Sequence, residues 1–292
     1  MFSNSKKKRD SIRFHAKLHE NRLVAPRSQR LLAAVGTVVG IVLLVGLSVG
    51  FSKLRSIWLE QCTITDMAAQ VEIESGRMVA ADVLAEGFGL KPGANLANID
   101  FDARRRELLR KIPNLRELTV LRRFPNHVKI TQEERIPLAR LGVTKSKTPT
   151  GRVVDAEGVV FSCQRNTGML PLIREPVQNR TAVGNRLSGR AYAALQLLSA
   201  TCETNFPALT VLEIDTDHTD YLAATLGPNY SSAKIAWDGM DMPTVSARNN
   251  MLRKLKRLQQ AISSNVNTGA VEWDATETDA QGRIYSRKKG SL

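Results

Sequence analysis

The sequence has few cysteines and none of the common catalytic signatures. Its three cysteines are Cys62, Cys163 and Cys202, and their spacing does not match a metal-binding pattern. We expect them to be small buried apolar residues. Three cysteines allow one disulfide, but the sequence does not predict one. The GxSxG, HExxH, CxxC and Walker A patterns are all missing. We therefore expect a protein that is not an enzyme, with no catalytic residue, metal, cofactor or small-molecule substrate.

Acidic residues are scarce at the start of the chain. Residues 1–30 contain nine Lys or Arg and two Asp or Glu, so they carry +7 of the chain's formal net charge of +14. A basic block can bind nucleic acid, but this one directly precedes a long uncharged apolar run. Membrane topology therefore explains the charge, and we expect a disordered cytoplasmic tail over residues 1–30 and no nucleic-acid partner.

The apolar run predicts a transmembrane helix over Leu31–Phe51. These 21 residues carry no charge and would form a helix about 31 Å long, close to the thickness of the hydrocarbon core. Because the basic residues are concentrated before the run, the N-terminus should be cytoplasmic and the rest should lie outside the inner membrane. The long basic segment before the run and the missing A-x-A-like site favour an uncleaved anchor over a signal peptide.

A small domain is predicted after a juxtamembrane stalk at residues 52–68. Apolar residues alternate at 71–73, which is typical of a strand. Residues 78–86 are expected to be helical, with Val79, Val83 and Leu84 on one face and Gly87 and Gly89 as stop signals.

A second helix should begin after Asp100, which can cap it, and end before Pro113. Its apolar stripe would consist of Phe101, Leu108, Leu109 and Ile112. A hairpin follows, with alternating strands around residues 118–122 and 128–130 and a turn at Pro125. The expected order over residues 69–135 is strand, helix, helix, strand, strand.

Residues 136–287 are richer in predicted strands, and residues 288–292 are assigned to a C-terminal tail. A hairpin is expected over residues 151–161, a helix over 191–202, and strands over 210–214, 221–226, 233–237, 270–273 and 283–286. Residues 245–262 predict an amphipathic helix with a basic face, and a solvated face is favoured there over docking of acidic protein or lipid.

One cluster of acidic residues and a histidine could be considered for metal or base chemistry. It consists of Asp215, Asp217, His218 and Asp220. These residues lie between two predicted strands, so a polar turn is the favoured interpretation.

A long ordered set of residues resembles the FtsQ/DivIB family of cell-division proteins. The matching positions are Gly93, Asn95, Leu96, Asp100, Pro113, Arg122, Pro125, Glu134, Arg135, Pro137, Asp155, Gly158 and Phe161. The resemblance covers roughly residues 25–287 and is specific up to Phe161.

The resemblance implies an α+β chain with one transmembrane helix, a β-α-α-β-β POTRA domain and a larger mixed β domain with flanking helices. It implies a non-enzymatic scaffold at the division septum that binds FtsB- and FtsL-like single-span partners and influences septal peptidoglycan synthesis. The partner-binding strand of the family would correspond to Gly282, Arg283, Ile284, Tyr285 and Ser286. Many relatives have an Arg-Tyr pair at the end of the preceding strand, where this chain has Asp274 and Ala275.

Two other functional classes stay open. A POTRA-bearing assembly or transport factor of the envelope usually has repeated POTRA units or a β-barrel segment, and the sequence indicates neither. A membrane-tethered cell-wall enzyme should have convergent catalytic residues, and the sequence suggests none.

Overall fold

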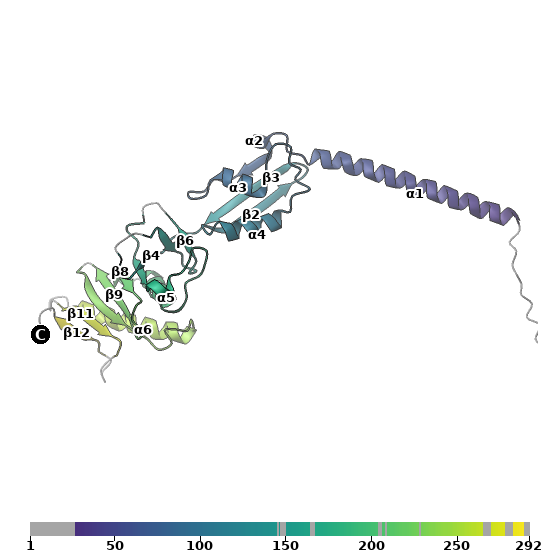
Figure 1. The fold of residues 1–292 in the computed structure, drawn as a ribbon. Helices are drawn as coiled ribbons and strands as arrows, with labels where there is room; N and C mark the ends of the chain where they lie inside the picture. Colours follow the sequence, from purple (N-terminus) through teal and green to yellow (C-terminus); the bar gives the residue numbers. More distant parts are fainter. Residues whose placement is uncertain are drawn as a thin grey trace, which may run out of the picture. The chain divides into compact units, whose positions relative to one another are not determined.

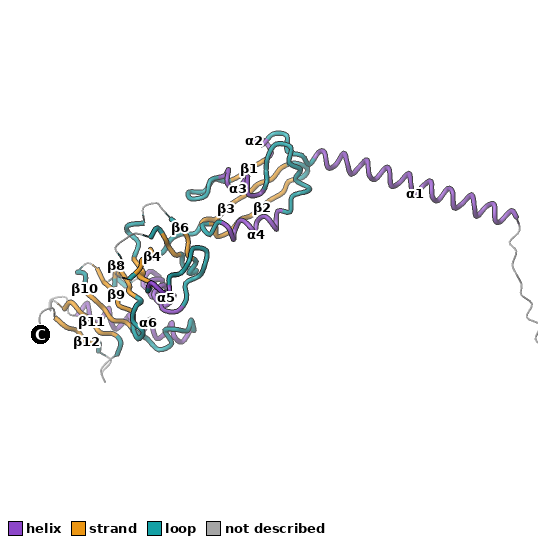
Figure 2. The backbone as a smooth tube through the Cα atoms, viewed as in Figure 1, coloured by secondary structure: helices purple, strands orange, loops and turns teal. Residues whose placement is uncertain are grey.

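A computed structural model describes residues 27–144, 146, 150–163, 167–203, 206–207, 209–227, 229–264, 270–277 and 283–288 (Figure 1). The chain divides into one unit that ends at Trp58 and another that begins at Leu59. Helices, strands and loops follow one another as drawn in Figure 2. The predicted basic tail, apart from its last four residues, lies outside the described residues.

The first unit contains most of one long helix, α1 (Arg27–Gln61), whose last three residues belong to the second unit. Its segment Val35–Gln61 has a mean hydropathy of 2.2 and is long and apolar enough to cross a membrane. Large apolar side chains such as Leu44, Leu47 and Phe51 are exposed along it. The helix continues ten residues beyond Phe51, so the first part of the expected stalk is helical.

The small domain has the predicted order of strand, helix, helix, strand and strand, preceded by a short helix that the sequence did not predict. It contains α2 (Met67–Gln70), β1 (Val71–Ile73), α3 (Ala81–Phe88), α4 (Phe101–Lys111), β2 (Leu115–Arg123) and β3 (His127–Glu134). The strand order is β1-β3-β2, with β1 parallel and β2 antiparallel to β3. Helices α3 and α4 pack on this sheet around one core, which includes Leu84, Phe88, Leu108 and Leu118.

Helix α3 differs from the sequence prediction at both ends. Val79 is buried but precedes the helix, and Val83 is exposed, so the predicted apolar face was wrong at Val83. Gly87 is not a stop signal: a Cβ there would lie 2.3 Å from Leu108 Cδ2, so this glycine permits close packing of α3 on α4. Gly89 does end the helix, with a left-handed φ of 75° that glycine adopts without strain.

Helix α4 begins as predicted. The Asp100 carboxylate accepts a hydrogen bond from the backbone N–H of Ala103 at 2.9 Å, which caps the helix. Phe101 and Leu108 are buried, whereas Leu109 is only partly buried, so the centre of the apolar stripe is Leu108.

The described strands of the larger domain form a nine-stranded sheet. They are β4 (Ala139–Val143), β5 (Arg152–Val154), β6 (Val160–Ser162), β7 (Leu172–Glu175), β8 (Thr210–Asp215), β9 (Leu222–Gly227), β10 (Ser231–Ile235), β11 (Ala270–Ala275) and β12 (Tyr285–Lys288). Their spatial order is β12-β11-β10-β9-β8-β7-β4-β5-β6. The sequence did not predict β4 and β7, which are adjacent and parallel inside the sheet.

Helices α5 (Gly189–Glu203) and α6 (Val245–Ser264) belong to the core of this domain. Helix α5 lies in the connection between the parallel strands β7 and β8, and α6 lies in the connection between the parallel strands β10 and β11. Each helix is therefore part of a crossover connection. The short 3-10 turn Val177–Asn179 follows β7. Cys62 and Cys163 are buried, Cys202 is exposed, and no disulfide joins any two of them.

Candidate partner-binding site

The last described strand, β12, lies at the outer edge of the nine-stranded sheet. It pairs with β11 in antiparallel register, with Trp273 opposite Ser286 and Asp274 opposite Tyr285. Among the described residues, no strand pairs with its other side. A free strand edge presents backbone N–H and C=O groups that can pair with a strand from another chain.

The strand begins later than expected from the sequence. Gly282 lies outside the described residues, and Arg283 and Ile284 precede the strand. Ile284 is partly buried and packs against the core of the domain. Tyr285 is 56% exposed, and Ser286 and Arg287 are exposed as well, so these residues are accessible to a partner.

Two rows of polar side chains cross the sheet next to this edge. The register aligns Lys234, Asp274 and Tyr285 in one row, and Ser232, Glu272 and Arg287 in the other. They belong to a hollow of about 250 Å³. Lys234 also lies 5.5 Å from the ring of Tyr221, which stacks on His218. The sequence analysis missed these rows, although the alternation of polar residues in β10 and β11 signals them.

The residues that carry the family resemblance lie elsewhere, in the small domain and at its junction with the larger one. The backbone N–H of Gly93, where φ is 83°, donates to the Ile64 carbonyl at 2.8 Å. The Asn95 amide donates to the Leu59 carbonyl at 2.6 Å, and Leu96 is buried. These contacts attach the loop before α4 to residues 59–64, at and just after the end of α1.

Arg122 of β2 contacts the same loop. Its guanidinium donates to the Leu96 carbonyl at 2.7 Å and lies over the rings of Phe101 and Phe124, at 5.1 and 4.9 Å. Pro125 follows in the β2–β3 turn, as predicted. A guanidinium between two rings gains cation–π attraction in addition to its hydrogen bond.

Glu134, at the end of β3, closes the loop before α3. Its carboxylate accepts hydrogen bonds from the backbone N–H groups of Arg77, Met78 and Val79 at 3.0, 2.7 and 2.8 Å. Three converging donors satisfy the charge of the carboxylate without a basic side chain.

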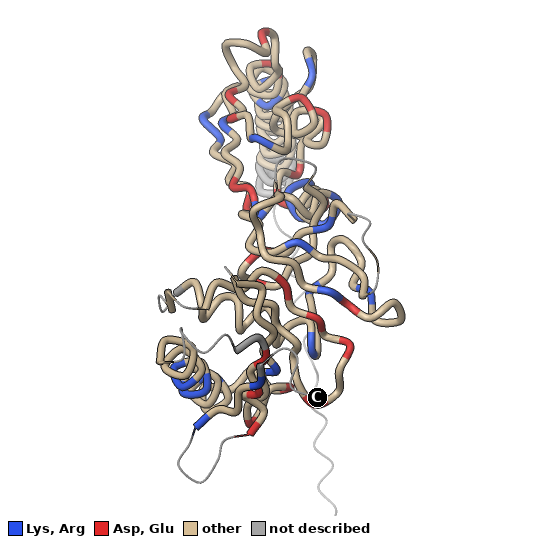
Figure 3. Tube along the Cα trace, turned by 90° about the vertical axis from the view of Figure 1, so that its left-hand side faces the viewer, with Lys and Arg blue, Asp and Glu red and all other residues tan. Residues whose placement is uncertain are grey.

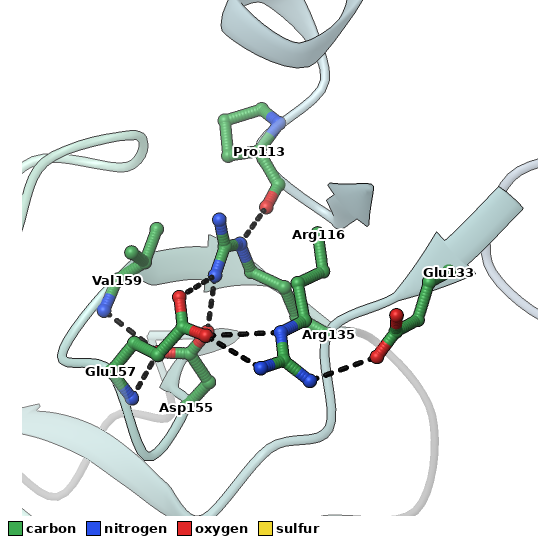
Figure 4. Close-up of polar contacts among 7 residues, drawn as sticks. All are labelled: Pro113, Arg116, Glu133, Arg135, Asp155, Glu157 and Val159. Atoms are coloured by element: carbon green, nitrogen blue, oxygen red, sulfur yellow. Dashed lines mark hydrogen bonds and ion pairs between the residues drawn. The ribbon is translucent and has the colours of Figure 1, made fainter. Parts of the chain in front are cut away.

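Arg135 joins the small domain to the larger one (Figure 4). Its guanidinium donates to the Pro113 carbonyl at 3.1 Å and to carboxylate oxygens of Asp155 and Glu157 at 2.5 and 3.2 Å. Asp155 also accepts from the backbone N–H groups of Glu157 and Val159, which shapes the β5–β6 turn.

Arg116 extends this junction toward the solvent (Figure 4). It pairs with Glu133 at 2.8 Å and with Glu157 at 2.9 Å, although it is about half exposed. Hydrogen bonding from Arg135 lowers the pKa of Glu157, with a further contribution from Arg116. Hydrogen bonding to Glu133 raises the pKa of Arg116.

The remaining motif residues support the same junction. Gly158 has a φ of 84° in the β5–β6 turn and lies against Tyr192, and Phe161 is fully buried. Phe161 belongs to a small apolar cluster against which Met78 of the small domain packs. Pro137 lines an adjacent hollow of about 570 Å³. These motif residues therefore contribute to the fold at this junction.

The acidic cluster between β8 and β9 forms polar turn contacts. The Asp215 carboxylate accepts from the Thr144 hydroxyl at 3.1 Å and from the Asp217 N–H at 3.0 Å. The ring of His218 stacks on the ring of Tyr221, with 4.4 Å between the ring centroids. Among the described residues, no group of three His, Cys, Asp or Glu side chains could hold a metal ion.

Comparison with known protein families identifies the small domain. Residues 68–135 match the family model of the FtsQ-type POTRA domain. No curated protein matches the chain. POTRA domains mediate protein–protein interactions, and the FtsQ-type family is generally non-enzymatic. The match supports a division-related scaffold role. An FtsQ-type POTRA domain that follows an N-terminal apolar helix makes this chain consistent with an FtsQ/DivIB-like protein.

Proposed function

We propose that this protein is a membrane-anchored scaffold of the bacterial division machinery that binds small single-span partners of the FtsB and FtsL type through β12. The position of β12 at the free edge of the nine-stranded sheet is the observation that supports this proposal most directly. Partner binding at this edge would bring the partners to the septum and influence septal peptidoglycan synthesis. The domains would be a POTRA domain at residues 69–135 and a β domain at 136–287.

A strand from the partner would add to β12 by backbone hydrogen bonds, and side chains would add specificity. Tyr285 is the exposed aromatic residue of this edge, and aromatic residues often contribute most of the binding energy at interfaces. Asp274, opposite Tyr285, and Ala275 stand where many relatives have an Arg-Tyr pair. Side-chain contacts would therefore differ from those of the relatives, while backbone pairing is unaffected.

Proline substitutions in β12 test this edge. Adjacent residues of a strand direct their N–H groups to opposite sides, so either Ser286→Pro or Arg287→Pro removes a donor from the free edge. We expect that one of the two lowers co-purification of the FtsB/FtsL-type partner by at least about tenfold, because β-augmentation depends on backbone donors. Ser286→Ala and Arg287→Ala are matched controls that retain the N–H groups. The proposed edge would be wrong if both prolines left the partner bound.

The proposed location is the inner membrane at the division septum, with the N-terminus in the cytoplasm. The apolar helix suggests a single-pass anchor, and the basic residues before it support this orientation. Residues from Leu59 onward would then lie outside the cytoplasm, where partner binding takes place.

Cysteine labelling tests the orientation. In a Cys202→Ser background, which removes the exposed native thiol, Ser286→Cys should react with a membrane-impermeant maleimide in intact spheroplasts. Ser11→Cys should react only after the membrane is permeabilised, because the positive-inside rule retains the basic tail in the cytoplasm. The opposite pattern would overturn the orientation and the proposed site of action together.

A further inference from the structure

Helix α6 carries an unusual concentration of positive charge. Its 20 residues include five basic ones, Arg248, Arg253, Lys254, Lys256 and Arg257, and no Asp or Glu. Figure 3 shows these basic positions along the helix. The apolar side of α6, with Met251, Leu255 and Leu258, is buried in the domain core. Four of the basic residues are exposed, whereas Lys254 is partly buried.

A hollow of about 350 Å³ lies beside this helix. It is lined by Ala236, Trp237, Asp238, Asn250, Arg253, Lys254, Arg257 and Thr276. Three of these side chains are basic and one is acidic, so the lining is positively charged. The hollow involves the segments that directly follow β10 and β11 and does not include residues of β12.

Two of the three basic side chains of the hollow donate hydrogen bonds to neutral groups. The Arg253 guanidinium donates to the Asn250 amide oxygen at 2.5 Å, and the Asn250 amide donates to the Asp238 carbonyl at 3.2 Å. The Lys254 ammonium donates to the Thr276 carbonyl at 3.0 Å. Among the described carboxylates, none forms an ion pair with Arg253, Lys254 or Arg257.

Partial burial disfavours the charged form of Lys254, and a negative partner would stabilise that form. Burial lowers the pKa of Lys254, with Arg257 acting in the same direction and Asp238, Asp274 and Glu277 opposing it. An anion placed in the hollow would replace solvent around Lys254 and would offset this cost. Charges in a concave site also interact more strongly than charges on a flat surface.

We propose that this hollow is a second docking site, distinct from β12, for an acidic protein segment that presents carboxylates to Arg253 and Arg257. The two arginines are four residues apart, about 6 Å along the helix axis, which is the spacing of Glu side chains at i and i+4 on a partner helix. Each guanidinium can bind a carboxylate through two parallel hydrogen bonds.

Other occupants fit less well. Helices that lie on a bilayer insert an apolar face next to their basic residues, but the apolar face of α6 is already buried in its own domain. A second copy of the chain is disfavoured, because each copy is also net basic outside residues 1–30, with a charge of +7. The absence of Asp and Glu from α6 favours a partner that is itself acidic.

A defined probe tests the site on the full chain in non-ionic detergent. The probe is a dye-labelled, alanine-rich helical peptide with Glu pairs four residues apart on one face, and binding is measured by fluorescence anisotropy at about 0.1 M salt. We expect saturable binding of this peptide and much weaker binding of its Gln counterpart. Arg253→Gln with Arg257→Gln should reduce the affinity by at least about tenfold.

A matched control separates the hollow from the charge of the helix. Arg248→Gln with Lys256→Gln removes the same charge from α6 outside the hollow and should change the affinity by less than about threefold. Equal losses in the two double variants, or equal binding of the Gln peptide, would each overturn the proposal. So would a larger loss of binding to anionic vesicles or duplex DNA than to the peptide in Arg253→Gln with Arg257→Gln, a comparison that excludes binding through the basic tail. Ser286→Pro and Arg287→Pro should leave peptide binding unchanged, so the two docking sites can fail independently.

Discussion

Leu108→Ala should lower the free energy of unfolding of the POTRA domain by about 2–5 kcal/mol, because it removes a buried side chain and leaves a cavity. Leu108 is 6% exposed and contacts both the sheet and α3, where Gly87 has no Cβ to fill the space. Gly87 has no side chain that could move into the cavity, so the expected loss of stability lies toward the upper end of this range.

Leu109→Ala is the matched control for this substitution. The same atoms are removed from the next residue of α4, with the same gain in helix propensity, but Leu109 is only partly buried. We expect a loss of about 1 kcal/mol. Amide hydrogen exchange of β3 in the full chain, measured by mass spectrometry, reports the difference. Equal effects of the two substitutions would contradict the assignment of the core face of α4.

Arg135→Ala should be the most damaging substitution at the junction, with a loss of about 3–5 kcal/mol. The side chains of Arg135 and Asp155 are only 13% and 7% exposed, so the substitution leaves a nearly buried carboxylate without its basic partner. The Pro113 carbonyl also loses its donor. Chemical denaturation of the full chain, followed by circular dichroism, measures the loss.

Arg116→Ala is the control for charge removal in the same network. Arg116 is about half exposed, so its ion pairs with Glu133 and Glu157 should contribute less than about 1 kcal/mol. Arg135→Ala combined with Asp155→Asn should be less harmful than Arg135→Ala alone, because no unpaired buried charge is left. If Arg116→Ala proved as harmful as Arg135→Ala, burial would not be the factor that makes the Arg135 pair important.

Acid should weaken the same junction. The pKa of Glu157 is lower in the folded protein than its ordinary value, so its contribution is fully present above that ordinary value. The contribution is lost as the pH falls through the lowered folded value.

Local sequence patterns predicted the elements that are specified by local chemistry. The Asp100 cap, the β2–β3 hairpin, the β5–β6 hairpin and the amphipathic helix α6 all depend on residues close together in the sequence. Their capping, turn and periodicity signals operate over a few residues, so the sequence alone was sufficient.

Elements that depend on distant partners were missed or misjudged. Strand β7 contains Arg174 and Glu175, which look unsuited to a sheet interior, yet Glu175 is fully buried because Arg152 pairs with it at 3.0 Å. Gly87 resembled a stop signal because its neighbour Leu108 is on another helix. The junction of Arg135 and Asp155 likewise unites residues 20 positions apart, and only the fold reveals that their charges meet.

The order of the strands in space has a consequence for timing. Strand β6, next to the junction, and strand β12 occupy opposite ends of the sheet, and β12 follows all other described strands along the chain. A ribosome therefore makes the proposed partner edge after every other described strand of the domain. In a chain that is stalled or only partly exported, β12 would be missing and β11 would be the edge strand. Partner binding at β12 would therefore require that synthesis and export have passed residue 288.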